Sequence, residues 1–119
     1  MSTVLVVDDD TQIAQILADM FEAAGFKTHA ATSAEQAMHY IHADPGIVLM
    51  VTDVRMPCVS GIRLAEMALA ERPTLPILLM SGYPGGTGET PPGWPFIRKP
   101  FRFADMLAMV RRLITPPTK

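Results

Sequence analysis

The sequence predicts a doubly wound α/β fold, with a five-stranded parallel sheet and helices on both of its faces. Short, continuous apolar runs rich in β-branched residues suit strands that are buried on both faces, as in a parallel sheet. These runs alternate with segments in which apolar residues recur at helical spacing, and such alternation is typical of βαβ units. The 119 residues, 49% hydrophobic and 18% charged, are enough for one domain with one sizeable core.

The chain opens with a predicted strand at residues 4–7, VLVV, which runs directly into three adjacent carboxylates, Asp8, Asp9 and Asp10. A helix follows, with Asp10 or Thr11 as its N-cap and Gly25 as its stop. The helical spacing predicts that six side chains of this segment face the core: Ile13, Ile16, Leu17, Met20, Phe21 and Ala24.

The middle of the chain repeats this alternation. Residues 26–31 form a weaker second strand, and Ser33 is a plausible N-cap for a helix that runs to about residue 42. Residues 47–52, IVLMVT, are apolar almost throughout and predict a third strand that ends at Asp53. A third helix is expected over residues 60–71.

The remaining strands end on polar residues as well. Residues 76–80, PILLM, predict a fourth strand ending at Ser81, and residues 96–98 predict a short fifth strand ending at Lys99. The segment between them, GYPGGTGETPPGWP, holds five glycines and four prolines, which predicts an irregular loop where this architecture normally has a helix. A last helix is expected over residues 102–114.

Composition excludes several classes of function. The formal net charge of −2 argues against nucleic acid as a direct partner, because a surface that follows phosphates needs a basic excess. A single cysteine, Cys58, leaves neither an internal disulfide nor a thiol cluster for zinc. No apolar run approaches the roughly 20 residues of a membrane span, and the N-terminus lacks a signal peptide pattern. We therefore expect a cytoplasmic domain without membrane contact.

The polar strand ends suggest a metal site. The carboxyl ends of parallel strands meet at one edge of the sheet, where ligands bind in open α/β folds. Asp8, Asp9 and Asp53 would meet there, and their carboxylates tolerate each other when a cation lies between them. Carboxylate oxygens without histidine or cysteine suit a hard ion, and Mg²⁺ leaves room for phosphate oxygens.

The same edge suits phosphoryl chemistry. A carboxylate beside Mg²⁺ is a competent nucleophile toward phosphorus and gives an aspartyl phosphate. The hydroxyl of Ser81 and the ammonium of Lys99 could then bind phosphoryl oxygens.

These residues give the chain its resemblance to a known family. The chain resembles the receiver domains of two-component response regulators over nearly its whole length. The matching motifs are Asp8-Asp9 after VLVV, Asp53 in VTDVRMP, Ser81 in LLMSG and Lys99 in FIRKPF, in the order and spacing of the family. The resemblance implies a flavodoxin-like sheet with strand order 2-1-3-4-5.

The resemblance also implies a role for each site residue. Asp53 would be the phosphoacceptor, and Mg²⁺ would be bound by Asp8, Asp9, Asp53 and the backbone carbonyl of Arg55. Ser81 would be the switch hydroxyl and Lys99 the partner of the phosphoryl group, with a cis Lys99-Pro100 peptide bond. Phe96 occupies the aromatic switch position of the family.

The chain departs from the family in two places. The span from Ser81 to Lys99 is short and lacks a helix signal, which loosely resembles receivers attached to hybrid sensor kinases. Phe96 lacks the hydroxyl of the more usual tyrosine, so any switching there is by packing alone. Arg55 and Tyr83 flank the acceptor at positions that modulate phosphate lifetime in the family.

We therefore expect residues 1–115 to form a receiver domain and residues 116–119 a tail. A histidine kinase or histidine phosphotransfer domain would donate the phosphoryl group, and the domain would catalyse only its own phosphoryl transfer and dephosphorylation. The docking surface would include the exposed side of the first helix (Gln12, Gln15 and Asp19) and the Pro100-Phe101 corner. The downstream protein partner stays unknown.

Two alternatives compete with this prediction. A phosphatase of the haloacid dehalogenase type uses the same chemistry, but Gln12 stands where its motif needs Thr or Val, and the chain is too short for a cap domain. A degenerate receiver that only binds partners is the other alternative, although all the reactive positions are present.

Overall fold

The computed structural model describes residues 2–82 and 94–114. The strands are β1 (Thr3–Val7), β2 (Lys27–Ala31), β3 (Ile47–Asp53), β4 (Ile77–Ser81) and β5 (Phe96–Arg98). The helices are α1 (Thr11–Ala23), α2 (Ala34–Ala43), α3 (Gly61–Glu71) and α4 (Phe103–Ile114). Each expected strand and helix is present, with bounds that differ from the predicted ones by a residue or two.

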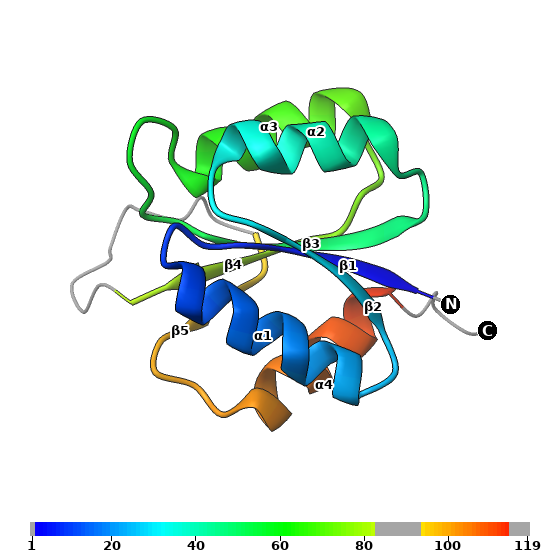
Figure 1. Cartoon of the computed structure of the whole chain (residues 1–119), viewed down its shortest axis with the longest axis vertical. Helices are drawn as coiled ribbons and strands as arrows, with labels where there is room; N and C mark the ends of the chain where they lie inside the picture. Colours follow the sequence, from blue (N-terminus) through cyan, green and yellow to red (C-terminus); the bar gives the residue numbers. More distant parts are fainter. Residues whose placement is uncertain (1, 83–93, 115–119) are drawn as a thin grey trace.

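The five strands form one parallel sheet in the order β2-β1-β3-β4-β5, which confirms the predicted fold. The sheet is the middle layer of three: α2 and α3 cover one face, and α1 and α4 cover the other (Figure 1). The central strands are buried on both faces, as their continuous apolar runs predict.

Side chains alternate along each strand and so build a separate core on each side of the sheet. Leu5 and Val7 of β1 pack with Leu64 of α3 on one face. Val4 and Val6 pack with Phe21 of α1 on the other face. The sheet is therefore held between two apolar layers, and its carboxyl edge is fixed by both.

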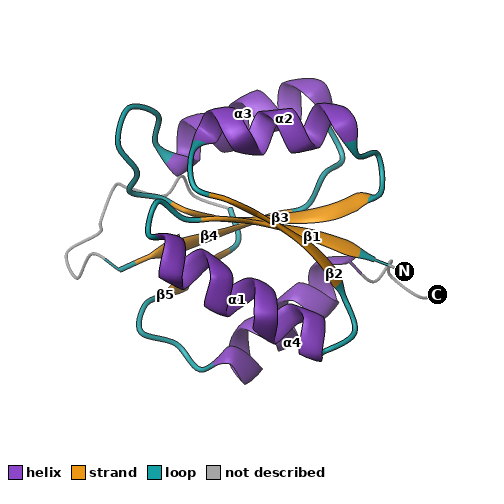
Figure 2. Ribbon diagram, viewed as in Figure 1, coloured by secondary structure: helices purple, strands orange, loops and turns teal. Residues whose placement is uncertain are grey.

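Helix caps fix the points where the chain leaves this edge. The carboxylate of Asp10 accepts hydrogen bonds from the backbone N–H groups of Gln12 and Ile13, so Asp10 rather than Thr11 is the N-cap of α1. Ser60 caps α3 by accepting a hydrogen bond from the N–H of Arg63. The loops that follow β1, β3 and β5 leave the sheet on the same side (Figure 2).

The predicted inward face of α1 is partly wrong. Leu17 and Phe21 are buried as expected, but Ile16 is 57% exposed and Met20 is 37% exposed. The small residues Ala14 and Ala18 are buried in their place, because they allow α1 to lie close to the sheet. Two large apolar side chains are thereby left at the surface.

Three predictions fall outside the described residues. Residues 83–93 are not described, so the predicted irregular loop between β4 and β5 and the position of Tyr83 fall outside the structure. The third is the predicted tail at residues 116–119. None of the helices in the described part of the chain has the length and apolar character that crossing a bilayer demands.

Candidate metal-binding and phosphoryl-acceptor site

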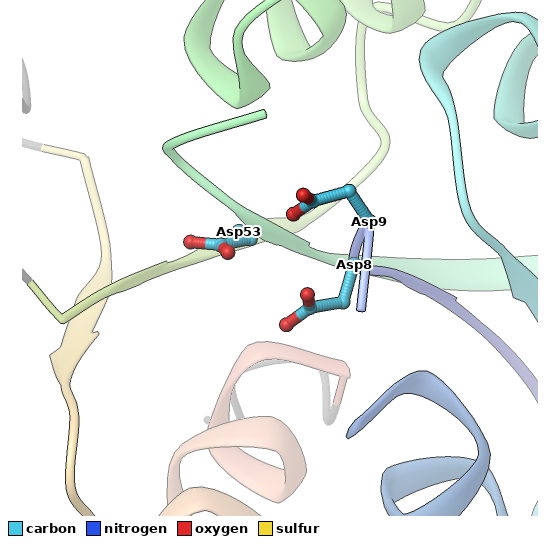
Figure 3. Close-up of side chains that lie close together, drawn as sticks. All are labelled: Asp8, Asp9 and Asp53. Carbon is cyan, nitrogen blue, oxygen red and sulfur yellow. The ribbon is translucent and has the colours of Figure 1, made fainter. Parts of the chain in front are cut away.

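Three carboxylates meet at the carboxyl edge of the sheet. Asp8 and Asp9 directly follow β1, and Asp53 is the last residue of the neighbouring strand β3. Figure 3 shows their side chains projecting from the two strands toward a common region. One carboxylate oxygen from each residue lies within 4.8 Å of the others, which is the spacing that a shared cation needs.

The three carboxylates differ in their surroundings. Asp8 is buried, with 1% of its surface exposed, while Asp9 is exposed. The buried Asp8 carboxylate accepts a hydrogen bond of 2.9 Å from the N–H of Asp10, which orients it. This all-oxygen donor set, open to solvent on the side of Asp9, fits Mg²⁺, which keeps several water ligands and binds few carboxylates.

Lys99 links the site to β5. Its Nζ lies 3.2 Å from the Asp8 carboxylate and 3.4 Å from the Asp53 carboxylate. Its backbone N–H donates a hydrogen bond of 2.7 Å to the carbonyl of Ser81, so β4 holds the base of the lysine in place. The Lys99-Pro100 peptide bond is cis.

The pKa of Asp53 is raised above the ordinary value of 3.8. Burial of the carboxyl group is the largest cause, and the negative charge of Asp8 adds to it, although Lys99 opposes both. The attraction of Asp53 and Asp8 raises the pKa of Lys99 in turn, despite its partial burial, which acts to lower it. The ionised form of Asp53 is therefore destabilised by its surroundings, and a cation bound beside it, in addition to Lys99, would stabilise that form.

The structure brings Ser81 to the same edge and leaves Phe96 away from it. Ser81 is the buried last residue of β4 and pairs with Arg98 in β5. Phe96 begins β5 and is 47% exposed, so its side chain lies at the surface. Arg55 is exposed in the loop after β3, and its backbone N–H lies 3.4 Å from a carboxylate oxygen of Asp53.

Sequence reasoning missed an apolar groove beside the site. The groove has a volume of about 580 Å³ and lies between α1 and the residues that follow β5. It is lined by Ile13, Ile16, Leu17, Met20, Pro100 and Phe101, among others. Lys99 also lines it, so the groove begins at the acidic cluster.

Sequence reasoning also passed over two small residues beside the acceptor. Gly61 begins α3, and Thr52 precedes Asp53 in β3. The helical spacing that predicts α3 carries no sign that Gly61 lies against Asp53. Thr52, the polar residue at the end of the apolar run IVLMVT, is a signal that the sequence does contain.

Comparison with known families gives one match over most of the chain. Residues 4–111 match the model of the response regulator receiver domain.

Curated proteins with related sequences are longer than this chain. The C4-dicarboxylate transport transcriptional regulatory protein DctD of Rhizobium meliloti is 33% identical over 92% of this chain, which spans 25% of that protein. The transcriptional regulatory protein FixJ of Bradyrhizobium diazoefficiens is 31% identical over 93% of this chain, which spans 56% of that protein. Since these relatives are transcriptional regulators, the expectation that this chain binds no nucleic acid directly stays a prediction.

Solved structures agree on the fold. A response regulator receiver protein from Pseudomonas putida is 32% identical, with a TM-score of 0.85 over 93% of this chain and 96% of that one. A response regulator receiver domain protein from Clostridium thermocellum has a TM-score of 0.87 over 96% of this chain and 94% of that one. At 21% identity, the second likeness concerns the fold alone.

Proposed function

Because this chain belongs to the family of response regulator receiver domains, we propose that Asp53 is its phosphoacceptor and that Mg²⁺ is bound beside it. The family identifies a signalling module of two-component systems and sets aside the phosphatase alternative. The observation that carries the proposal is the convergence of Asp8, Asp9 and Asp53 within 4.8 Å, with Lys99 in reach of two of the three.

Mg²⁺ would be held by carboxylate oxygens of Asp8, Asp9 and Asp53 and by the backbone carbonyl of Arg55. When bound, the ion neutralises charge on the acceptor and on the phosphoryl oxygens. The protein itself holds the three carboxylates close together, although this destabilises the ionised form of Asp53. Burial and the charge of Asp8 disfavour the ionised form of Asp53, as its raised pKa indicates.

The transfer step follows from the nucleophilic carboxylate. An oxygen of Asp53 attacks the phosphorus of a phosphohistidine, and a P–O bond forms as the P–N bond to the donor imidazole breaks. The imidazole nitrogen keeps the electron pair of the broken bond. Lys99 then exchanges its contact with Asp53 for a phosphoryl oxygen, and the hydroxyl of Ser81 donates to another. In a separate hydrolytic step, water attacks phosphorus, the P–O bond to Asp53 breaks, and inorganic phosphate leaves as the carboxylate is restored. The domain would thus catalyse only its own phosphorylation and dephosphorylation.

Ser81 and Phe96 would relay the change. Movement of the Ser81 hydroxyl onto the phosphoryl group vacates space at the end of β4, and the exposed ring of Phe96 on the neighbouring strand is free to repack. The side chains of Arg55 and Tyr83 would limit the access of water to the acceptor and so set the lifetime of the phosphorylated form.

The phosphodonor would be a histidine kinase or a histidine phosphotransfer domain. Its docking surface would be the apolar groove along α1, with Gln12, Gln15 and Asp19 on the exposed side of this helix and Pro100-Phe101 at the far wall. An apolar groove that reaches Lys99, the lysine beside the acceptor carboxylate, suits a helix that presents its phosphohistidine. We assign the receiver to residues 1–115, with a tail at 116–119, and place its action in the cytoplasm, without direct contact with nucleic acid or membrane.

The metal dependence tests this assignment with a matched pair of variants. We expect Asp9→Asn to weaken Mg²⁺ binding about 10-fold or more, measured by titration calorimetry, because it removes a ligand. Asp10→Asn makes the same chemical change one residue later, where the carboxylate caps α1. Its Mg²⁺ affinity should stay near that of the wild type. Equal weakening in both variants would contradict the proposed ligand set.

A further inference from the structure

The backbone of Asp53 lies against the first residue of α3. A Cβ atom built on Gly61 would overlap the carbonyl oxygen of Asp53, and it would lie 2.8 Å from the Asp53 carbonyl carbon and 3.0 Å from the Cα of Val54. All of these atoms belong to the backbone of the strand, so no side-chain rotation could make room. Only glycine fits at this position without a shift of the strand end or the helix.

Helix formation alone does not explain this glycine. Ser60 already caps α3, and alanine in place of glycine would favour a helix by up to about 1 kcal/mol. The described backbone of Gly61 does not have a positive φ angle either, since Gly25 is the glycine recorded with one. The close approach to Asp53 is therefore the feature of the fold that requires glycine.

Three hydrogen bonds hold the backbone of Asp53 and Val54 in place. The N–H of Gly61 donates to the carbonyl of Val54 at 2.8 Å, and the N–H of Val54 donates to the carbonyl of Met80 in β4 at 2.8 Å. The hydroxyl of Thr52, which is fully buried, donates to the carbonyl of Asp53 at 3.1 Å. The peptide after the acceptor is thus fixed between β4 and the start of α3.

We propose that Gly61 and Thr52 are positioning residues for the acceptor: they fix the backbone of Asp53 so that its carboxylate meets Asp8 and Asp9 at the metal site. This inference rests on the proposed function, since it takes Asp53 as the acceptor. Neither residue is among the proposed ligands of the metal or of the phosphoryl group. Both act through the backbone of Asp53, whose displacement would move its carboxylate relative to Asp8 and Asp9.

Gly61→Ala tests the proposal, with Gly46→Ala as its matched control. Gly46 stands just before β3, at the opposite end of the strand from Asp53, and a Cβ there would meet the side-chain carboxylate of Asp44 at 3.1 Å and no backbone atom of the strand. We expect Gly61→Ala to weaken Mg²⁺ binding about 10–100-fold, the range seen when groups behind metal ligands are removed. Its phosphorylation by acetyl phosphate at saturating Mg²⁺ should also slow, by on the order of 100-fold. Gly46→Ala should change neither quantity more than about twofold.

A merely structural role would give a different result. We expect Leu64→Ala, which removes a buried side chain from the apolar cluster under the same helix, to lower stability. If folded Gly61→Ala resembled Leu64→Ala, with lowered stability but wild-type Mg²⁺ affinity and phosphorylation rate, the proposal would be wrong.

A second pair of variants applies if Gly61→Ala does not fold. Thr52→Val removes the hydroxyl while keeping the shape of the side chain, and Thr52→Ser keeps the hydroxyl. Weaker Mg²⁺ binding in Thr52→Val, restored in Thr52→Ser, would support the proposal, and wild-type binding in Thr52→Val would overturn it. The Mg²⁺ titration also separates the two levels of the account. If the wild type bound Mg²⁺ but accepted no phosphoryl group, the proposed function would be wrong. The Mg²⁺ affinities of the Gly61 and Thr52 variants would still decide whether these residues position the Asp53 carboxylate.

Discussion

The ammonium of Lys99 lies 3.2 Å from the carboxylate of Asp8, which joins two residues 91 positions apart in the sequence. The same ammonium reaches Asp53 at 3.4 Å. The ammonium of the residue that follows β5 thus offsets the charge of two carboxylates, one just after β1 and one at the end of β3.

Replacing this lysine tests its role in the metal-free protein. We expect Lys99→Met to lower the free energy of unfolding by about 1–3 kcal/mol at neutral pH in EDTA, because two largely buried carboxylates lose their partner. Mg²⁺ should recover part of this loss. Urea unfolding with and without Mg²⁺ measures both effects.

The control for Lys99→Met is Arg102→Met. Arg102 forms an exposed ion pair with Asp105, and exposed pairs contribute no more than about 1 kcal/mol. A Lys99→Met protein as stable as Arg102→Met would show that Lys99 does not offset the acidic cluster.

The raised pKa of Asp53 predicts a pH dependence of stability in EDTA. Between the ordinary carboxyl pKa of 3.8 and the raised value, the folded protein holds a proton that the unfolded chain has released. The free energy of unfolding should therefore fall as the pH rises through this window. In Asp53→Asn this fall should disappear, as measured by urea unfolding at a series of pH values. An identical pH profile for the variant and the wild type would assign the titration to another group.

If the phosphohistidine donor docks in the groove along α1, a charge placed in the groove should slow phosphoryl transfer from that donor but not from acetyl phosphate. Ile16→Asp places a charge in the groove at a side chain that is already 57% exposed, so the fold should be kept. Phosphoryl transfer from a phosphohistidine protein should slow by about 10-fold or more, since a charge in an apolar contact must be desolvated. Phosphorylation by acetyl phosphate, which needs no docking, should be unchanged.

The matched control for Ile16→Asp is Ala70→Asp. Ala70 is exposed on α3, on the opposite face of the sheet. If both variants slowed transfer from the phosphohistidine protein equally, the groove would not be the docking surface.

The aromatic contact between α1 and α4 predicts a large loss of stability on truncation. Phe21 is fully buried, with its ring centroid 5.0 Å from that of Phe103 and 5.8 Å from that of Phe26. We expect Phe21→Ala to cost about 3–5 kcal/mol in the free energy of unfolding. Met20→Ala, one residue earlier and 37% exposed, should cost less than about 1 kcal/mol. Similar losses in the two variants would contradict the described packing of α1.

The sequence predicted the sheet and its carboxyl edge well, for a physical reason. Strands buried on both faces leave continuous apolar runs, and the polar residue that ends each run marks the edge directly. Asp8, Asp53, Ser81 and Lys99 were all visible in this way, and the structure brings Asp8, Asp53 and Lys99 into contact distance.

Other features depend on distances that a sequence does not contain. Helical spacing groups Ile16 and Met20 with Leu17 and Phe21, but it does not give the width of the stripe that the sheet covers. The requirement for Gly61 comes from the backbone of a strand that ends eight residues earlier, and no local pattern reveals that approach.

Intact mass after incubation with acetyl phosphate and Mg²⁺, for the wild type and for Asp53→Asn, tests the central claim most directly. The account predicts one phosphoryl adduct on the wild type, lost under mild base and blocked by EDTA, and no adduct on the variant. An adduct of equal yield on Asp53→Asn would contradict the assignment of Asp53. A folded wild type that took no phosphoryl group from acetyl phosphate or from a phosphohistidine donor would contradict the proposed function.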